Sequence, residues 1–257
     1  MTEPLLLTTA RVTTYDGDKV LTGASGFFFL RDERLFLVTS RHVLQDAPSQ
    51  HHPNRIDIEL HTDAVNLTQA CVVSVWLFKD GQSQWRQGTD SGGEIDVAAI
   101  EIDRSLLPET AEFRYFTPEH LQEQSELGEV EVGRDLLIVG YPLGFHDTMY
   151  HLPVVRSAVI ASAFGIRFQG QGLFLTDART HRGTSGAPVV MRDKEQAGAA
   201  LPWKLLGVHS SRIDMGTRDQ VLDESLGLNA AWYATILMTL TDDVPTDAKD
   251  QQIANSD

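Results

Sequence analysis

Cysteine is nearly absent from this chain, and its scarcity excludes a fold held together by disulfides. The sequence of 257 residues contains a single cysteine, Cys71, so no disulfide can form within it. A hydrophobic core must therefore stabilise the fold, and a chain of this length can bury one. Because disulfide-free chains are typical of reducing compartments, we expect a cytoplasmic protein.

Basic residues are also in short supply, which limits the possible partners. Lysine and arginine number 21 against 36 aspartates and glutamates, and the formal net charge is -15. A protein that follows a phosphate backbone needs the opposite balance. We therefore expect no nucleic-acid partner.

Long apolar runs are missing as well. The first ten residues carry Glu3 where a secretory leader would be basic, and their apolar run, Leu5–Leu7, is only three residues long. This pattern predicts neither a signal peptide nor a transmembrane segment. We expect no association with a membrane.

The most informative stretch of the chain is Thr176–Val190, which surrounds Ser185. This serine lies on a turn-prone loop directly before an apolar strand pattern, an arrangement that can present a hydroxyl group. Gly183 has no Cβ, so the loop can turn until the amides of Gly183 and Ser185 point at one oxygen atom. The stretch therefore indicates a nucleophile with an oxyanion hole, and the alternative is a plain turn between strands.

A nucleophilic serine needs a base and a group that orients the base, and both occur upstream. His42 ends the apolar strand pattern of Arg34–Leu44, and Asp96 opens the apolar run Asp96–Ile102. Asp90 and Asp103 are weaker candidates for the orienting role because neither opens a buried run. The order His, Asp, Ser also excludes an α/β-hydrolase, in which the serine comes first.

These blocks resemble the chymotrypsin-like (trypsin-like) serine peptidases, in particular their disulfide-free bacterial branch, which includes Deg-type proteases and glutamyl endopeptidases. Two of the blocks depart from the usual form: Ser40–Arg41 stand where two alanines are common, and Ala187 stands where a second glycine is usual. Four blocks match in the family's order and two more support them: Gly23–Phe29, Val38–Val43, Ile95–Ile100 and Thr176–Val190, with Val139–Pro142 and Leu205–Ser210.

The resemblance implies an all-β fold of two antiparallel six-stranded β-barrels followed by a C-terminal α-helix. The first barrel would occupy residues 1–110 and carry the His and Asp; the second barrel and helix would occupy 111–240; and 241–257 would form a disordered acidic tail. That tail is too short for the peptide-binding module of a Deg-type protease, which predicts a stand-alone peptidase unit. Apolar patterns predict strands, start and stop signals predict a helix at Thr117–Gly128, and helical spacing with good helix formers predicts one at Asn229–Leu240. The predicted strands are Leu6–Thr14, Gly23–Leu30, Arg34–Thr39, Ile56–Leu60, Cys71–Phe78, a short segment at Trp85, Asp96–Ile102, Arg134–Gly140, Val154–Ser162, Gly172–Thr176, Gly186–Arg192 and Lys204–Ser210.

The same resemblance implies the chemistry of a serine endopeptidase, which cleaves a peptide or protein substrate through an acyl-enzyme and needs no cofactor. Ser185 would attack the carbonyl, His42 would move the proton, Asp96 would orient His42, and the amides of Gly183 and Ser185 would hold the oxyanion. Ser210 would lie beside the substrate backbone and support Asp96. The alternative is a peptide-binding pseudoprotease, or a regulatory module gated by a partner.

Substrate preference is predicted from four residues that align with the pocket of the family: Arg179, Thr180, His209 and Ser210. Arg179 stands where trypsin-type enzymes carry an aspartate, which disfavours cleavage after Lys or Arg. Thr180 and His209 align with the residues that bind a carboxylate in glutamyl endopeptidases, and Arg179 or Arg212 could add positive charge. We therefore expect a preference for Glu or Asp before the cut; the alternative is that Thr180 is structural and His209 a satisfied strand residue.

The remaining histidines predict no metal site. His51, His52 and His61 are expected in a solvated loop and its exit, because no cluster with ligand spacing accompanies them. His120, His146 and His151 are expected at the surface or in turns. Two glycine-containing loops, Gln169–Gly172 and Ala197–Ala200, are candidates for mobile segments near the site.

Overall fold

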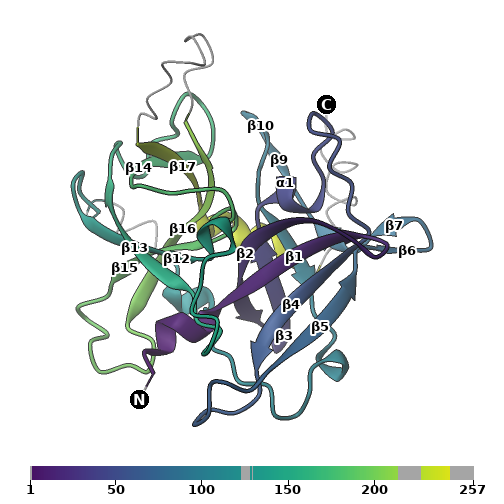
Figure 1. Ribbon diagram of the computed structural model, residues 1–257. Helices are drawn as coiled ribbons and strands as arrows, with labels where there is room; N and C mark the ends of the chain where they lie inside the picture. The colour runs from purple at the N-terminus through teal and green to yellow at the C-terminus, as the bar shows by residue number, and fades with distance from the viewer. Residues whose placement is uncertain (1, 123–127, 129, 214–226, 244–257) are drawn as a thin grey trace.

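The computed structural model describes residues 2–122, 128, 130–213 and 227–243, and most of its regular structure is β (Figure 1). A first sheet of seven strands has the order β5-β4-β1-β2-β3-β11-β8, and a closed barrel of six strands has the order β12-β13-β14-β17-β16-β15. Figure 1 shows the two units side by side. The strands of the first sheet are β1 (Thr9–Asp16), β2 (Lys19–Arg31), β3 (Arg34–Thr39), β4 (Arg55–His61), β5 (Ala70–Trp76), β8 (Trp85–Arg86) and β11 (Ala98–Glu101).

The barrel uses the second half of the chain, and small hairpins decorate the first half. Its strands are β12 (Asp135–Gly140), β13 (Val154–Ile160), β14 (Leu173–Asp177), β15 (Pro188–Arg192), β16 (Trp203–Arg212) and β17 (Leu228–Tyr233). The hairpins pair β6 (Phe78–Lys79) with β7 (Gln82–Ser83), and β9 (Thr89–Asp90) with β10 (Gly93–Glu94).

The continuous apolar runs of the sequence lie where strands are buried on both faces. In β2, Phe28 enters the core of the first sheet, while Phe27 and Phe29 enter a second core shared with the barrel. The same alternation divides Ile138 from Val139 in β12 between the barrel core and the shared core. Because successive side chains of a strand point to opposite faces, a run without polar residues can fill two cores at once.

The predicted all-β fold of two barrel-like units is correct, but its first unit contains seven strands rather than six. The short segment predicted at Trp85 is the two-residue strand β8, which pairs with β11 through Trp85 and Ile100. Side chains from all seven strands meet in one core, so this sheet wraps around its interior as a barrel does.

The predicted C-terminal helix over Asn229–Leu240 is wrong in its first half. Residues from Leu228 to Tyr233 form β17, which lies between β14 and β16 and closes the barrel. Ala230 and Ala231 are buried there although alanine is the strongest helix former. Hydrogen bonds to two neighbouring strands outweigh this intrinsic preference, which amounts to less than about 1 kcal/mol per residue. Helical structure begins at the 3₁₀ turn η6 (Ala234–Ile236) and ends with α2 (Leu237–Leu240).

Two other predicted boundaries also change. The chain begins with the 3₁₀ helix η1 (Pro4–Thr8), so strand β1 starts three residues later than the pattern predicts. The helix predicted at Thr117–Gly128 begins as the short 3₁₀ turn η3 (Pro118–His120), and residues 123–127 lie outside the described residues. The predicted tail also lies outside them from residue 244 onward.

The described helices are all short, and none of them is long and apolar enough to cross a bilayer. The remaining ones are α1 (Arg41–Leu44), η2 (Arg104–Leu106) and η5 (Pro142–Gly144). Cys71 is a free, half-buried thiol on β5.

Candidate active site

Strand pairing brings His42 and Asp96 together from distant parts of the sequence. The end of β3 pairs with the start of β11 through Thr39 and Ala98, and the short helix α1 directly after β3 carries His42. The Nδ1 atom of His42 lies 2.7 Å from Oδ2 of Asp96, and the backbone N–H of His42 donates to Oδ1 at 2.8 Å. The carboxylate therefore fixes both the ring and the backbone of the histidine.

The surroundings of this pair shift both pKa values in ways that favour a charged couple. Burial by itself would lower the pKa of His42, but the hydrogen bond and charge of Asp96, helped by Asp46, raise it above its ordinary value. Burial would raise the pKa of Asp96, yet the contacts with His42 and the hydroxyl of Ser210 hold it below its ordinary value. Asp96 is therefore ionised at neutral pH, and His42 is a stronger base than a free imidazole.

Ser210 links this pair to the loop that carries Ser185. Its hydroxyl donates to Oδ2 of Asp96, and its carbonyl oxygen accepts a hydrogen bond of 3.0 Å from the hydroxyl of Ser185. Strands β15 and β16 set this proximity, because the N–H of Gly186 donates to the carbonyl of His209. Within the described residues no hydrogen bond joins Ser185 to His42, so the hydroxyl is turned toward β16 in this conformation.

The loop before Ser185 leaves two backbone amides unpaired. Among the described residues neither the N–H of Gly183 nor that of Ser185 donates to a protein acceptor. The carbonyl of Arg182 accepts a hydrogen bond from Leu143 N. Since the N–H of a trans peptide points away from its carbonyl, the N–H of Gly183 is directed away from Leu143. Gly183 has a φ of 90°, a left-handed conformation that glycine adopts at little cost.

His42, Gly183 and Ser185 line one open cavity of about 540 Å³. Its opposite wall is the start of β2, and the remaining side is the loop after α1. A cavity of this size can take several side chains of an extended peptide. The full lining is Lys19, Val20, Leu21, Thr22, Gly23, Ala24, His42, Val43, Asp46, Ser49, Gln50, His51, Arg182, Gly183 and Ser185.

Comparison with known proteins identifies the family. A family model described as a trypsin-like peptidase domain matches residues 24–198, which is well over half of the chain. The chain belongs to the trypsin-like peptidase family. No curated protein matches the sequence.

A solved structure shows the same fold for this trypsin-like peptidase domain, and a second was also found. A serine endoprotease from Yersinia pestis aligns with a TM-score of 0.54 at 15% identity, over 92% of this chain and 62% of that one. The present chain therefore spans less than two thirds of that protein. The protease Rv3671c of M. tuberculosis, in an inactive form, aligns at 14% identity with a TM-score of 0.49, over 93% of this chain and 91% of that one.

The sequence analysis assigned no role to Ser25, which holds the loop that carries Ser185 in place. Its buried hydroxyl donates to the carbonyl of Gly183 at 2.8 Å and accepts from Tyr141 N at 2.9 Å, while its N–H donates to the carbonyl of Ser185 at 3.0 Å. A Cβ added to Gly140 would lie 2.6 Å from the Ser25 hydroxyl. The run of small residues from 23 to 26 was the available signal, because close backbone approach requires small side chains.

The residues predicted to bind the substrate side chain differ in their surroundings. The hydroxyl of Thr180 is buried and donates to Oδ1 of Asn229, whose amide nitrogen donates to the carbonyls of Ala178 and Gly227. Thr180 therefore has a structural role here. Arg179 is exposed. Part of the chain after Arg212, residues 214–226, lies outside the described residues.

His209 is buried in β16 and is not a satisfied strand residue. Within the described part of the chain its Nδ1 atom has no hydrogen-bond partner. Burial, with a smaller contribution from the nearby His42, lowers the pKa of His209 to about 4 despite the opposing charge of Asp96. The imidazole is therefore neutral at neutral pH and can donate one hydrogen bond.

The competing acids and the remaining histidines lie elsewhere in the trypsin-like domain. Asp90 pairs with Arg167 at 2.8 Å, and Asp103 caps the turn η2 through Ser105 N. His61 was expected near solvent but is buried at the end of β4. The segment that contains Tyr150 covers it, and its Nε2 bonds to the carbonyl of Tyr150 at 2.7 Å. His51 bonds through Nε2 to the carbonyl of Val43, and His52 is exposed as predicted.

Proposed function

We propose that this trypsin-like domain is an active serine endopeptidase in which Ser185 is the nucleophile, His42 the general base and Asp96 the residue that orients the base. The observation that carries the proposal is the hydrogen-bonded chain from His42 through Asp96 to Ser210, which also accepts the hydroxyl of Ser185. All three proposed catalytic side chains are thereby joined to one network. The substrate would be a peptide or protein.

The first step requires Ser185 to change its side-chain rotamer. Its hydroxyl would leave the carbonyl of Ser210 and turn to Nε2 of His42, which has no protein partner among the described residues. This exchange gives up one neutral hydrogen bond, worth about 0.5–1.5 kcal/mol, and substrate binding can offset that cost. His42 would then take the proton as Ser185 attacks the carbonyl carbon, and later deliver it to the leaving amine.

The oxyanion that forms would be held by the amides of Gly183 and Ser185. Neither N–H has a protein acceptor among the described residues, which supports this assignment. An N–H that already donates to a protein acceptor could not donate to the negatively charged oxygen. Each such donor is typically worth about 2.7–4 kcal/mol at the transition state. The resulting acyl-enzyme would be hydrolysed by water through the same groups.

A fluorophosphonate probe tests this proposal, because it reacts with an activated serine and not with an ordinary one. We expect labelling of the native protein and its loss in Ser185→Ala and in His42→Ala. Ser157→Ala is the matched control, since Ser157 is exposed on β13 and should leave labelling unchanged. A folded native protein that neither takes up the probe nor cleaves a casein substrate would instead be a peptide-binding module.

For the residue before the scissile bond, we propose a preference for Glu or Asp that depends on His209. The unpartnered Nδ1 of this buried imidazole supports a role as donor to a carboxylate, and Arg179 could add a positive charge. Thr180 is a weaker candidate than the sequence indicates, because its hydroxyl hydrogen is already donated to Asn229.

Peptides that differ only in the residue before the cut test the preference. We expect kcat/KM for Glu to exceed that for Gln about tenfold or more, which corresponds to roughly 1.4 kcal/mol, and this ratio should collapse in His209→Leu. Thr180→Val should leave the ratio nearly unchanged. Equal cleavage after Glu, Leu and Lys by the native protein would refute the preference while leaving the peptidase assignment intact.

A further inference from the structure

The segment that connects β12 to β13, residues 141–153, touches the loop of Ser185 directly. Leu143 N donates to the carbonyl of Arg182, and a Cβ on Gly183 would lie 2.5 Å from the carbonyl oxygen of Tyr141. The position of this connecting segment therefore fixes the peptide that joins Arg182 to Gly183. The direction of the Gly183 N–H depends on that peptide.

Apolar packing contributes little to holding the middle of the connecting segment, from Leu143 to Met149, although Tyr141 at its start is buried. Leu143, Phe145 and Met149 are 70%, 69% and 62% exposed. Segments with few buried apolar contacts belong to the least stable parts of a protein. The contacts that tie this segment to β4 are polar instead, and His61 supplies one of them through the carbonyl of Tyr150.

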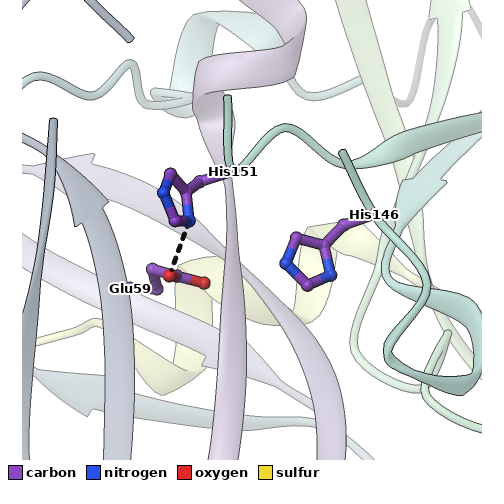
Figure 2. Close-up of side chains that lie close together, drawn as sticks. All are labelled: Glu59, His146 and His151. Carbon is purple, nitrogen blue, oxygen red and sulfur yellow. Dashed lines mark ion pairs between the residues drawn. The ribbon is translucent and has the colours of Figure 1, made fainter. Parts of the chain in front are cut away.

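Three potential metal ligands meet at this junction. Glu59 comes from β4, and His146 and His151 come from the connecting segment; one ligand atom of each lies within 4.8 Å of the others (Figure 2). Nδ1 of His151 is 2.8 Å from Oε1 of Glu59 but is not aligned to form a hydrogen bond with it. This buried nitrogen therefore faces the carboxylate without being satisfied.

The third side chain is already oriented toward the other two. Nδ1 of His146 lies 2.6 Å from the carbonyl of Gly144 and must carry the proton of that hydrogen bond. The lone pair then resides on Nε2, and Figure 2 shows one ring nitrogen of His146 turned toward Glu59 and His151. A histidine that donates its other N–H to a backbone carbonyl is the usual form of a metal ligand.

We propose that Glu59, His146 and His151 bind a divalent transition-metal ion, zinc in preference to magnesium or calcium. Two imidazole nitrogens and one carboxylate oxygen suit zinc, whereas the harder cations require oxygen ligands. All three residues are half-buried, which leaves room for water as the fourth ligand. The ligand atoms already lie within 4.8 Å of one another, and an ion would hold them at the separation of about 3.4 Å expected in a tetrahedral zinc site.

Neighbouring charges are compatible with the ion. Arg11 lies 3.3 Å from Oε2 of Glu59, the oxygen that does not face His151, and so leaves Oε1 for the metal. Asp147 is exposed, and its carboxylate accepts hydrogen bonds from the amides of Met149 and Tyr150, which shapes the turn between the two histidines.

The bound ion would clamp the connecting segment to β4 and so hold the amide of Gly183 in position. This consequence rests on the proposed peptidase function, whereas the metal site itself does not. Zinc would then raise the reactivity of Ser185 from a distance, without entering the cavity that contains it.

Metal binding is tested on the full chain after treatment with a chelator. Cobalt(II) is added while its visible absorption is recorded, and zinc affinity is measured by competition with a chromophoric indicator. We expect one equivalent to bind, with affinity reduced about tenfold or more in His146→Gln and in Glu59→Gln. His52→Gln is the control and should bind as the native protein does. His42→Ala should also retain binding, which separates this site from the His42–Asp96 pair.

The proposed metal site would be refuted if the native protein bound no stoichiometric cobalt(II) or zinc. It would also be refuted if the zinc affinity of the native protein equalled that of His146→Gln and Glu59→Gln. The clamp has its own measurement, hydrogen exchange at the amides of 143–151, which zinc should slow in the native protein but not in His146→Gln. If zinc bound without changing hydrogen exchange at these amides, the clamp would be refuted and the metal site itself would stand. Slowed exchange in a protein that no fluorophosphonate labels would contradict the peptidase function alone.

Discussion

The residues of the proposed catalytic group were predictable because each sits at a local change of pattern. His42 ends an apolar strand, Asp96 opens another, and Ser185 follows a glycine that can take a positive φ. The rotamer of Ser185 was not predictable, since the choice between the carbonyl of Ser210 and the ring of His42 depends on atoms from β16. Ser25 escaped notice for the same reason, because its partners come from the other half of the chain.

The raised pKa of His42 predicts the pH dependence of the reaction. Only the neutral imidazole can accept the serine proton, so activity should fall as the pH drops through the pKa of this group. We expect the acid limb of kcat/KM to have an apparent pKa above the ordinary histidine value of about 6.5. Steady-state assays over a pH range of about 5–9 measure this apparent pKa.

The variant Asp96→Asn provides the control for that assignment. Without the carboxylate, burial would dominate, so the limb should move to lower pH while kcat falls about 10⁴-fold. A limb at the same pH in both proteins would show that a group other than His42 titrates there.

At the scale of helices and strands, the sequence patterns were partly misleading. The Asn229–Leu240 stretch has good helix formers, yet its first half is the strand that closes the barrel, because β14 and β16 both need a partner. Strand β3, by contrast, runs from Arg34 to Thr39 as predicted, since its apolar run is bounded by turns. Local patterns predicted elements well where local and long-range preferences agreed, and failed where they did not.

The loop that carries Ser185 yields a sharp prediction about glycine. In Gly183→Ala, the new Cβ would meet the carbonyl of Tyr141 and the left-handed φ of 90° would be strained. We expect the loop to rearrange and fluorophosphonate labelling to fall about 100-fold or more, as for the loss of an oxyanion donor. Circular dichroism should show that the protein remains folded.

Gly198→Ala is the matched control, because a Cβ there meets nothing within 4 Å and its φ is not in the left-handed region. Its labelling rate should equal that of the native protein. Equal labelling of both alanine variants would contradict the assignment of the Gly183 amide to the oxyanion hole.

At the scale of the whole molecule, one core joins the two units. It contains Phe27, Phe29 and Phe36 from the first sheet together with Val139, Leu205 and Val208 from the barrel. The sequence predicted strands at these positions, but not that alternate residues of a strand belong to different cores. That division depends on how two curved sheets meet, which no short stretch of sequence specifies.

The shared core predicts that both units unfold in a single transition. Leu205 is fully buried in it, so Leu205→Ala should lower the free energy of unfolding by about 2–5 kcal/mol. Leu106→Ala, at a position that is 51% exposed, should change it by less than about 0.5 kcal/mol. Urea titration gives both values, and hydrogen exchange should show amides of both sheets losing protection together. Separate transitions for the two sheets would refute this.

The hydrogen bonds of Ser25 have a practical consequence for anyone who wishes to control this protein from outside. Ser25 on β2, in the first half of the chain, forms hydrogen bonds with the backbone at Gly183 and Ser185 in the second half. If the chain were divided between β11 and β12, we would therefore expect each separately produced fragment to be inactive. Fusing them to a pair of proteins that associate on command would restore probe labelling only when the pair assembles, and the chain would then serve as a reporter of that encounter.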